Sequence, residues 1–143
     1  MTLKGFLDTN IFLDHLFQRN RDSEQIIRLC EQKHFVGFAS SASFNTLAYV
    51  IQERLKKEVH PVLRKFSKLI EMVPTSQEDI DQALDSNFED IEDAFQHYTA
   101  LNVRTLDYFI TDNTKDYKTH FKLPFKLPIV SASDFVKITS SST

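Results

Sequence analysis

The sequence predicts a three-layer α/β/α sandwich around a central parallel sheet. Short apolar segments, typical of buried strands, alternate along the chain with longer segments whose apolar residues recur at helical spacing. Strands that are separated by helices pair in parallel and are covered by helices on both faces. The chain of 143 residues shows no linker or repeat, so we expect one domain over residues 1–138 and a flexible Ser-rich tail over 139–143.

The first half of the chain contains two predicted strands and three predicted helices. Asp8, Thr9 and Asn10 follow the first apolar segment and are residue types that begin helices. The predicted elements are a strand over residues 3–7, a helix through residue 16, a helix around 26–30, a strand over 35–39 and a helix over 43–57.

The second half continues the alternation. An aromatic and β-branched segment, 107–111, is typical of a strand, and the acid Asp112 follows it. The predicted elements are a helix from Pro61 to residue 70, a short strand at 72–73, a short helix over 80–84, a helix over 88–101, strands over 107–111 and 127–130, and a capped terminal helix over 131–136.

Charge and composition exclude some classes of function. A net charge of −3 argues against a domain that adheres broadly to nucleic acid, because such domains are usually strongly basic. It leaves open a site that meets a phosphate through a bound cation. No apolar run approaches the roughly 20 residues that span a bilayer, and no export signal opens the chain, so we expect a cytoplasmic protein without membrane contact.

Four aspartates are candidate metal ligands: Asp8, Asp93, Asp112 and Asp116. Parallel sheets place ligands at the carboxyl ends of their strands, where Asp8 and Asp112 are expected to lie. Hard divalent cations such as Mg²⁺ prefer oxygen ligands, and several carboxylates in one place repel one another unless a cation neutralises them.

Each of these acids also has a purely structural interpretation. Asp8 is suited to cap the helix that follows it, and Asp93 can be the third residue of a capping box that begins at Asp90. Asp112 and Asp116 can serve turns, which Asp and Asn favour. The lone Cys30 is expected to be a buried thiol, and the five histidines, His97 among them, show no metal-ligand spacing. We expect Asp93 to lie away from the apolar face of its helix and His97 to be a surface or partly packed residue.

Three segments, in this order, resemble the PIN-domain family. They are Phe6-Leu7-Asp8-Thr9-Asn10-Ile11 with Asp14, then 88–94 leading into Gln96-His97-Tyr98-Thr99-Ala100, then 108–117. The resemblance covers nearly the whole chain. Within the family, the chain is most similar to the branch that contains many toxins of bacterial toxin–antitoxin pairs. It implies Mg²⁺- or Mn²⁺-dependent cleavage of RNA.

The resemblance also assigns roles to residues. Asp8 matches the first metal acid and Asp93 the helix acid, while the last ligand stays open among Asp112, Asn113 and Asp116. The supporting residues are Asn10, which matches the residue that helps to fix the first acid, together with Thr111, Asn113 and Asn45.

Two departures from the family pattern affect this assignment. Asp112 stands where the family often has Arg, which removes a cation and adds a carboxylate. Asn45 stands near the place where many PIN nucleases have a Glu, so it is expected to be a neutral ligand or a supporting donor. Glu53, the nearest Glu, is expected to be a surface charge.

Two other functions and three partners follow as hypotheses. One hypothesis is a degenerate PIN fold that acts as an RNA- or protein-binding module. The other is a haloacid-dehalogenase-type phosphohydrolase, in which an Asp also follows the first strand, but such enzymes have a second Asp at the position where this chain has Asn10. The expected partners are an RNA substrate, an antitoxin that covers the acidic mouth, and a second copy of the chain bound around Phe66 and Leu69, for which a core role is the alternative.

Overall fold

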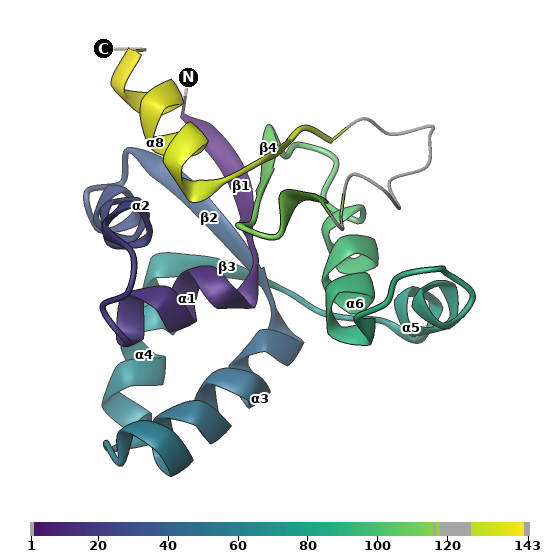
Figure 1. Ribbon diagram of the computed structural model, residues 1–143, viewed down its shortest axis with the longest axis horizontal. Coiled ribbons are helices and arrows are strands. Elements are labelled where there is room, and N and C mark those ends of the chain that lie inside the picture. The colour runs from purple at the N-terminus through teal and green to yellow at the C-terminus, as the bar shows by residue number, and fades with distance from the viewer. Residues whose placement is uncertain (1, 116, 118–126, 142–143) are drawn as a thin grey trace.

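Five strands form a single parallel sheet at the centre of the molecule (Figure 1). The computed structural model describes residues 2–115, 117 and 127–141. Every pair of neighbouring strands is parallel, in the order β3-β2-β1-β4-β5, which confirms the predicted parallel sheet. The strands are β1 (Leu3–Leu7), β2 (Phe35–Ser40), β3 (Ile70–Val73), β4 (Tyr108–Ile110) and β5 (Ile129–Val130).

Helices cover both faces of this sheet and complete the predicted three-layer sandwich. Figure 1 shows α1, α2 and α4 on one side of the sheet, and α6, with α5 packed outside it, on the other. The helices are α1 (Thr9–Leu16), α2 (Arg21–Glu31), α3 (Ser41–Val50), the π-helical η1 (Ile51–Leu55), α4 (Val59–Leu69), α5 (Gln77–Leu84), α6 (Ile91–Ala100) and α8 (Ala132–Ser141). No helix of the described residues is both long and apolar enough to cross a membrane.

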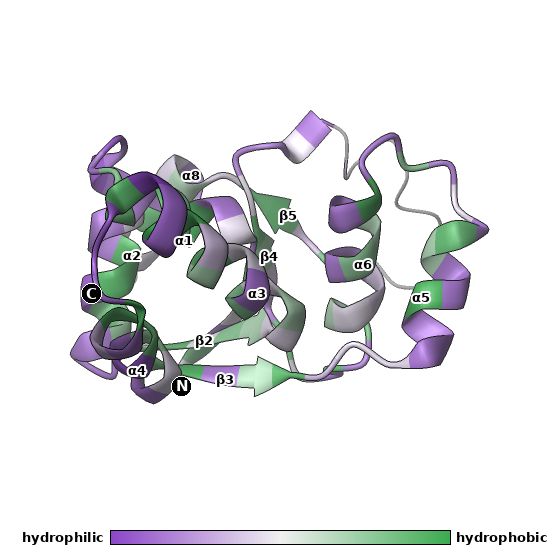
Figure 2. Cartoon of the chain, turned by 90° about the horizontal axis from the view of Figure 1, so that it is seen from below, coloured by the Kyte–Doolittle hydropathy of each residue, from purple (hydrophilic) through white to green (hydrophobic). Residues whose placement is uncertain are grey.

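The core is divided by the sheet into two apolar clusters. The larger one lies under α1, α2 and α4 and includes Phe12, Phe35 and Phe66, and the smaller one, on the α6 side, includes Phe6 and Phe109 with their rings stacked 5.3 Å apart. Figure 2 shows β2 and β5 mainly in the hydrophobic colour, whereas hydrophobic and hydrophilic stretches alternate along the helices. Phe66 therefore belongs to the core, which was the predicted alternative to a place on a dimer surface.

Gly5 and Cys30 show how closely the larger cluster is packed. A Cβ atom on Gly5, in the central strand, would lie 2.9 Å from Cζ of Phe35, so only glycine fits there without a shift of the ring. Cys30 is buried, as predicted, and burial raises the pKa of its thiol to about 12. Such a thiol is inert as a nucleophile.

The ends of two elements differ from the predictions. The helix expected over 43–57 is α-helical only to Val50 and continues as η1, which ends at Lys56 in the left-handed conformation with φ 54°. Ile70, expected at the end of a helix, is instead extended and pairs with Gly37, because it opens strand β3.

The terminal helix is longer than predicted. We expected it over 131–136 with a tail from residue 139, but α8 runs from Ala132 to Ser141. Hydroxyl groups near its end donate to backbone carbonyl oxygens of the preceding turn; the donors are Thr139, Ser140 and Ser141. These bonds satisfy the hydroxyl groups within the helix, so residues 139–141 belong to α8 although composition alone suggests a tail.

The sheet topology places the candidate site. The chain leaves β1 for β2 on one side, whereas β4 pairs on the other side of β1, so the strand order reverses at the carboxyl ends of β1 and β4. Asp8 follows β1 and Thr111 follows β4, and the Asp8 N–H donates to the Ile110 carbonyl oxygen at 3.0 Å. A crevice for ligands is expected at such a reversal point.

Candidate metal centre

Asp8 directly follows β1 at this reversal point, where we use the word crevice for the region around Asp8 and Asp93, and it is only 1% exposed. Its carboxylate caps α1 weakly, since Oδ1 accepts from the Asn10 N–H at 3.4 Å. Stronger bonds come from other elements, because Thr111 Oγ1 donates to Oδ2 at 2.6 Å and Gln96 Nε2 donates to Oδ1 at 3.0 Å. Asp8 is thus a helix cap, as one interpretation held, and is also held by neutral donors from two distant segments.

Asp93 enters the same crevice from the first turn of α6. Asp90 is the N-cap of this helix and accepts from the N–H groups of Glu92 and Asp93. The Asp93 carboxylate does not complete a capping box; its Oδ2 accepts from Asn113 Nδ2 at 3.0 Å. The helix is therefore capped by Asp90, and Asp93 is directed into the site.

A chain of hydrogen bonds joins the two acids. Thr111 Oγ1 donates to Asp8 and accepts from the Asn113 N–H at 3.0 Å, while the Asn113 side chain bonds to Asp93. Gln96, one turn after Asp93 on α6, bonds to Asp8 directly. The fold therefore brings together two aspartates that are far apart in the sequence.

The surroundings of Asp8 and Asp93 disfavour the ionised form of both carboxyl groups. Burial raises the pKa of Asp8, against hydrogen bonds from Thr111 and Gln96 that lower it. Burial, and then the negative charges of Asp8 and Asp90, raise the pKa of Asp93 to about 7. Within the described residues, no Lys or Arg forms an ion pair with Asp8 or Asp93.

Tyr117 lies beside these acids, and we did not predict it. It is fully buried, and burial together with the charges of Asp8 and Asp93 raises the pKa of its phenol. Its hydroxyl interacts with the Asp93 carboxylate, and this contact lowers the pKa of Asp93 while it raises that of the phenol. Tyr117 therefore belongs to the polar surroundings of Asp93.

Asp112 is engaged elsewhere. Its side chain is exposed, and both oxygens have partners: Asn20 Nδ2 donates to Oδ2 at 3.0 Å, and the Ala132 N–H donates to Oδ1 at 3.0 Å. Asp112 thus ties the end of β4 to the start of α8, and no hydrogen bond between described residues links it to Asp8 or Asp93. The fourth predicted acid, Asp116, lies outside the described residues.

The two other asparagines take limited parts in the site. Asn10 is exposed, and its backbone N–H, rather than its side chain, bonds to Asp8. Asn45 is also exposed, on the first turns of α3, where it lines a pocket of about 240 Å³ beside the acids. Thr9, Ser43 and Gln96 line the same pocket, so Asn45 lies next to the groups that hold Asp8.

Gln96 is the supporting residue that the sequence analysis overlooked. It donates to Asp8 while its Oε1 accepts from the Thr9 N–H at 2.9 Å, and Thr9 Oγ1 lies 2.6 Å from Ser43 Oγ. A signal was present, because Gln96 stands in the motif quoted for the family resemblance and lies three residues after Asp93. Three residues is one helical turn, which places both side chains on the same face.

The buried face of α6 also differs from the prediction. We expected Asp93 away from the apolar face and His97 at the surface, yet Asp93 is 5% exposed and His97 4% exposed, whereas Ile91 is 41% exposed. Burial lowers the pKa of His97 to about 4. The prediction was wrong because this helix turns its mixed polar face, rather than its most apolar one, toward the crevice and the sheet.

The residues present fit a hard divalent cation. The oxygens of the Asp8 and Asp93 carboxylates are the kind of ligand that Mg²⁺ and Mn²⁺ prefer, and the neutral groups of Thr111, Gln96 and Asn113 that surround them add no competing cation. Among the residues that the structure describes, no three His, Cys, Asp or Glu side chains cluster closely enough to hold a metal by themselves. Two carboxylates suffice for Mg²⁺, which usually keeps waters and substrate phosphates as its other ligands.

Comparison with known proteins decides the family. The family model described as PIN domain matches residues 4–115, which is most of the chain and includes both acids. The chain belongs to the PIN-domain family. Membership removes the haloacid-dehalogenase alternative, and a comparison with curated protein sequences gave no match.

Solved structures agree with the fold of this PIN domain. A chain of a toxin-antitoxin complex from Klebsiella pneumoniae has a TM-score of 0.60 and 21% identity, with 86% of this chain and 99% of that chain covered. VapBC2 from Rickettsia felis bound to a DNA fragment from its promoter gives 0.64 and 18%, covering 90% and 98%. FitAB bound to an IR36 DNA fragment gives 0.62 and 14%, covering 90% and 94%.

Proposed function

We propose that this PIN domain is a metal-dependent ribonuclease that hydrolyses RNA phosphodiester bonds with Mg²⁺ or Mn²⁺ held by Asp8 and Asp93. One observation carries the proposal: burial raises the pKa of both carboxylates, the charge of Asp8 raises that of Asp93 further, and no described Lys or Arg pairs with either acid. A divalent cation offsets this cost and makes both acids fully ionised at neutral pH.

Asn113 is the third ligand in this proposal. The family motif left Asp112, Asn113 and Asp116 open, and the contacts of the described residues favour Asn113, since it bonds to Asp93 while Asp112 holds α8. Asp116 lies outside the described residues and stays a predicted ligand. Thr111 and Gln96 act as positioning residues, because they orient the Asp8 carboxylate without facing the solvent themselves.

The chemistry divides between the cation and the protein. A bound divalent cation supplies Lewis acidity toward a phosphate oxygen and lowers the pKa of a water molecule. The protein fixes the acids: Thr111 and Gln96 leave Asp8 little freedom to rotate, and Asn113 does the same for Asp93. Such preorganised oxygen ligands need no rearrangement when substrate arrives.

The biological role that we propose is that of a toxin in a toxin–antitoxin pair. The fold similarity to chains of a toxin-antitoxin complex, of VapBC2 and of FitAB supports it. An antitoxin segment would cover the acidic crevice, and an Arg side chain suits two unpaired carboxylates well because its guanidinium binds them with two parallel hydrogen bonds.

A non-enzymatic function is the second candidate. Asn45 replaces an acid that many PIN nucleases have, and the described residues bring only two carboxylates into the crevice. A site with fewer carboxylates binds its cation more weakly. In that case the protein would bind RNA or another protein without cleaving it.

Calorimetric titration with Mn²⁺, followed by a cleavage assay on single-stranded RNA, separates these functions. We expect the unmodified protein to bind Mn²⁺ and cleave RNA, and Asp8→Asn to do neither. Asp81→Asn, which removes one exposed acid from α5, is the matched control and should behave as the unmodified protein. Absence of Mn²⁺ binding in the unmodified protein would end the nuclease proposal, and metal binding without cleavage would favour the binding module.

A further inference from the structure

The described part of the chain contains one segment that is rich in exposed Lys and Arg side chains. Residues 54–68 contain six of the seventeen Lys and Arg residues and a single acid, Glu58, although the whole chain carries a net charge of −3. We call this segment's Lys and Arg side chains, together with the neighbouring His60, the basic face, and all of them are exposed. The basic face consists of Arg54, Lys56, Lys57, His60, Arg64, Lys65 and Lys68.

Helical spacing directs these side chains the same way. His60, Arg64 and Lys68 are four residues apart on α4, so they lie in a row along one side of the helix. Together with Pro61 and Lys65 they line a shallow depression of about 510 Å³. The opposite side of α4 is held in the core by Phe66, which fixes the orientation of the row.

The charge of the basic face is poorly neutralised by the protein. Within the described part of the chain its one ion pair joins Lys65 Nζ to Glu31 at 3.5 Å. By contrast, Arg21 and Arg28 on α2 share a depression with Asp22 and Glu24. Surface positive charge in excess of the nearby acids attracts polyanions, and in this respect the segment 54–68 differs from α2.

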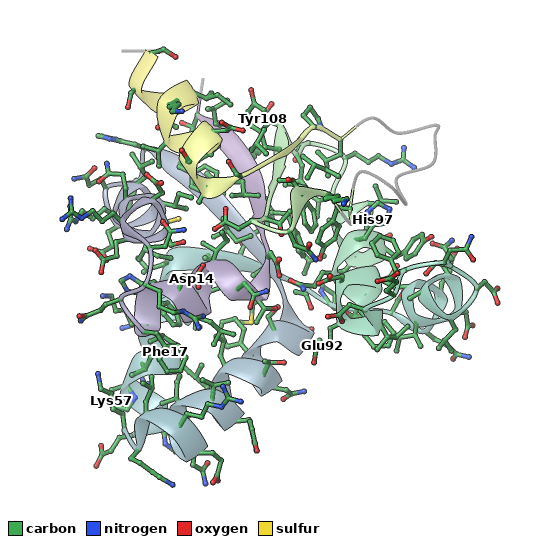
Figure 3. All side chains as sticks on the ribbon, viewed as in Figure 1. Asp14, Phe17, Lys57, Glu92, His97 and Tyr108 are labelled. Carbon is green, nitrogen blue, oxygen red and sulfur yellow. The ribbon has the colours of Figure 1, made fainter. Side chains whose placement is uncertain are left out.

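The basic face lies at the far end of α3 from the metal centre. The first turns of α3 contribute Asn45 and Thr46 to the pocket beside the acids, which Glu92 of α6 also lines. The helix then continues through η1 to Lys57, and Figure 3 labels Glu92 and Lys57 near its two ends. The fifteen residues of α3 and η1 separate the two regions by roughly 20 Å at 1.5 Å per residue.

We propose that the basic face binds the phosphates of a single-stranded RNA several nucleotides away from the bond that is cleaved at the metal centre. This inference rests on the proposed ribonuclease function and adds the surface that supplies affinity. The acidic crevice repels a phosphate chain except where the cation sits, so binding energy must come from elsewhere. A strand stacked at about 3.4 Å per nucleotide covers the distance in roughly six nucleotides.

A binding experiment without metal tests the surface. The variant Lys57→Gln, Arg64→Gln, Lys68→Gln removes three cations that have no described partner, and Arg21→Gln, Arg28→Gln, Lys137→Gln is the control with the same change of net charge. Fluorescence anisotropy with a 16-nucleotide single-stranded RNA is measured in chelator over a range of salt. We expect the basic-face variant to bind at least tenfold more weakly near 0.1 M salt, with a salt slope smaller by about 2, and the control to match the unmodified protein.

Three results would overturn the inference. The first is an equal loss of affinity in both triple variants, which would report net charge alone. The second is no loss in either variant. The third is displacement of the RNA by polyglutamate as effectively as by unlabelled RNA, which would make the basic face a surface for acidic protein segments.

A cleavage experiment links the basic face to the metal centre. With Mn²⁺, we expect kcat/KM on the 16-nucleotide RNA to fall at least tenfold in the basic-face variant, while a tetranucleotide, too short to reach α4, is cleaved equally by all three proteins. A loss on the tetranucleotide would contradict the inference. If the unmodified protein cleaves neither RNA, the ribonuclease proposal fails, whereas the metal-free binding experiment still decides whether α4 binds RNA.

Discussion

Ionisation of Asp93 is unfavourable in the protein without metal, so the free energy of unfolding depends on pH. Burial and the charge of Asp8 raise the pKa of Asp93 from 3.8 to about 7, so the folded protein holds a proton that the unfolded chain releases. The stability that this proton confers is present at acid pH and declines as pH rises from about 4 to about 7. Burial of His97, which lowers its pKa to about 4, acts in the opposite direction below pH 6.5.

The variant Asp93→Asn should stabilise the metal-free protein. It removes a buried charge and leaves an amide that can still bond to Asn113, so we expect the free energy of unfolding at pH 8 to rise by about 1–3 kcal/mol. Urea unfolding in chelator at pH 8 and pH 5 measures the effect, which should shrink at the lower pH. A variant that is less stable than its parent at pH 8 would show that Asp93 ionises without cost.

Gln96 should matter for metal affinity without being a ligand. Its removal in Gln96→Ala leaves the buried Thr9 N–H without a partner and frees the Asp8 carboxylate to rotate. We expect a loss of about 1–3 kcal/mol in stability and a fall of about 10- to 100-fold in Mn²⁺ affinity, measured by calorimetry. Gln82→Ala, at an exposed position of α5, is the control and should change neither quantity.

At the scale of elements, α6 is the helix that assembles the site. Its N-cap Asp90 sets where the helix begins, and this start places Asp93 and Gln96 one turn apart on the face toward Asp8. Two neighbouring strands also end here, because Asp8 follows β1 and Thr111 follows β4. A shift of the helix start by one residue would rotate both side chains by about 100° away from the crevice.

The terminal helix α8 gives a test of the role of Asp112. Because Asp112 accepts from the Ala132 N–H at the start of α8, Asp112→Ala should cost about 1–2 kcal/mol of stability, as the loss of a helix cap does. Mn²⁺ affinity should stay within a few-fold of the unmodified protein. If the affinity instead falls as far as in Asp8→Asn, measured in parallel, Asp112 rather than Asn113 is the metal ligand.

At the scale of the whole molecule, charge and topology are separated into regions. Acids follow β1 and β4 at the carboxyl ends of these strands, while in the described part of the chain the segment 54–68, at the far end of α3, carries six exposed Lys and Arg side chains. A cation bound at the crevice joins elements from both faces of the sheet, since Asp8 precedes α1 and Asp93 belongs to α6. Metal binding should therefore stabilise the entire fold.

Thermal unfolding should report this coupling. With Mn²⁺ at about 100 times its dissociation constant, we expect the free energy of unfolding to rise by about 2.7 kcal/mol and Tm by roughly 10 °C. Asp8→Asn should show no such rise at the same concentration. A rise of equal size in that variant would mean that Mn²⁺ binds somewhere other than the proposed centre.

Much of this fold was predictable, because apolar periodicity distinguishes buried strands from helices. The segment 35–39 was predicted as a strand and α6 as a helix, and both are confirmed. One error lies where a tertiary contact overrides local preference, because Ile70 joins the sheet through pairing with Gly37. Another lies at the end of α8, where residues expected to form a tail are helical as far as Ser141.

The sequence by itself determined the parallel α/β/α fold, the family, and the aspartates that end β1 and begin α6, because spacing and residue type are local properties of the chain. Only the tertiary structure decided which side chains complete the site. In it Gln96, Thr111 and Asn113 form hydrogen bonds with the two acids, whereas Asp112 accepts a hydrogen bond from the start of α8. Hydrogen bonds between distant segments depend on how elements pack. Packing depends on the whole chain and cannot be predicted from a local pattern of residues.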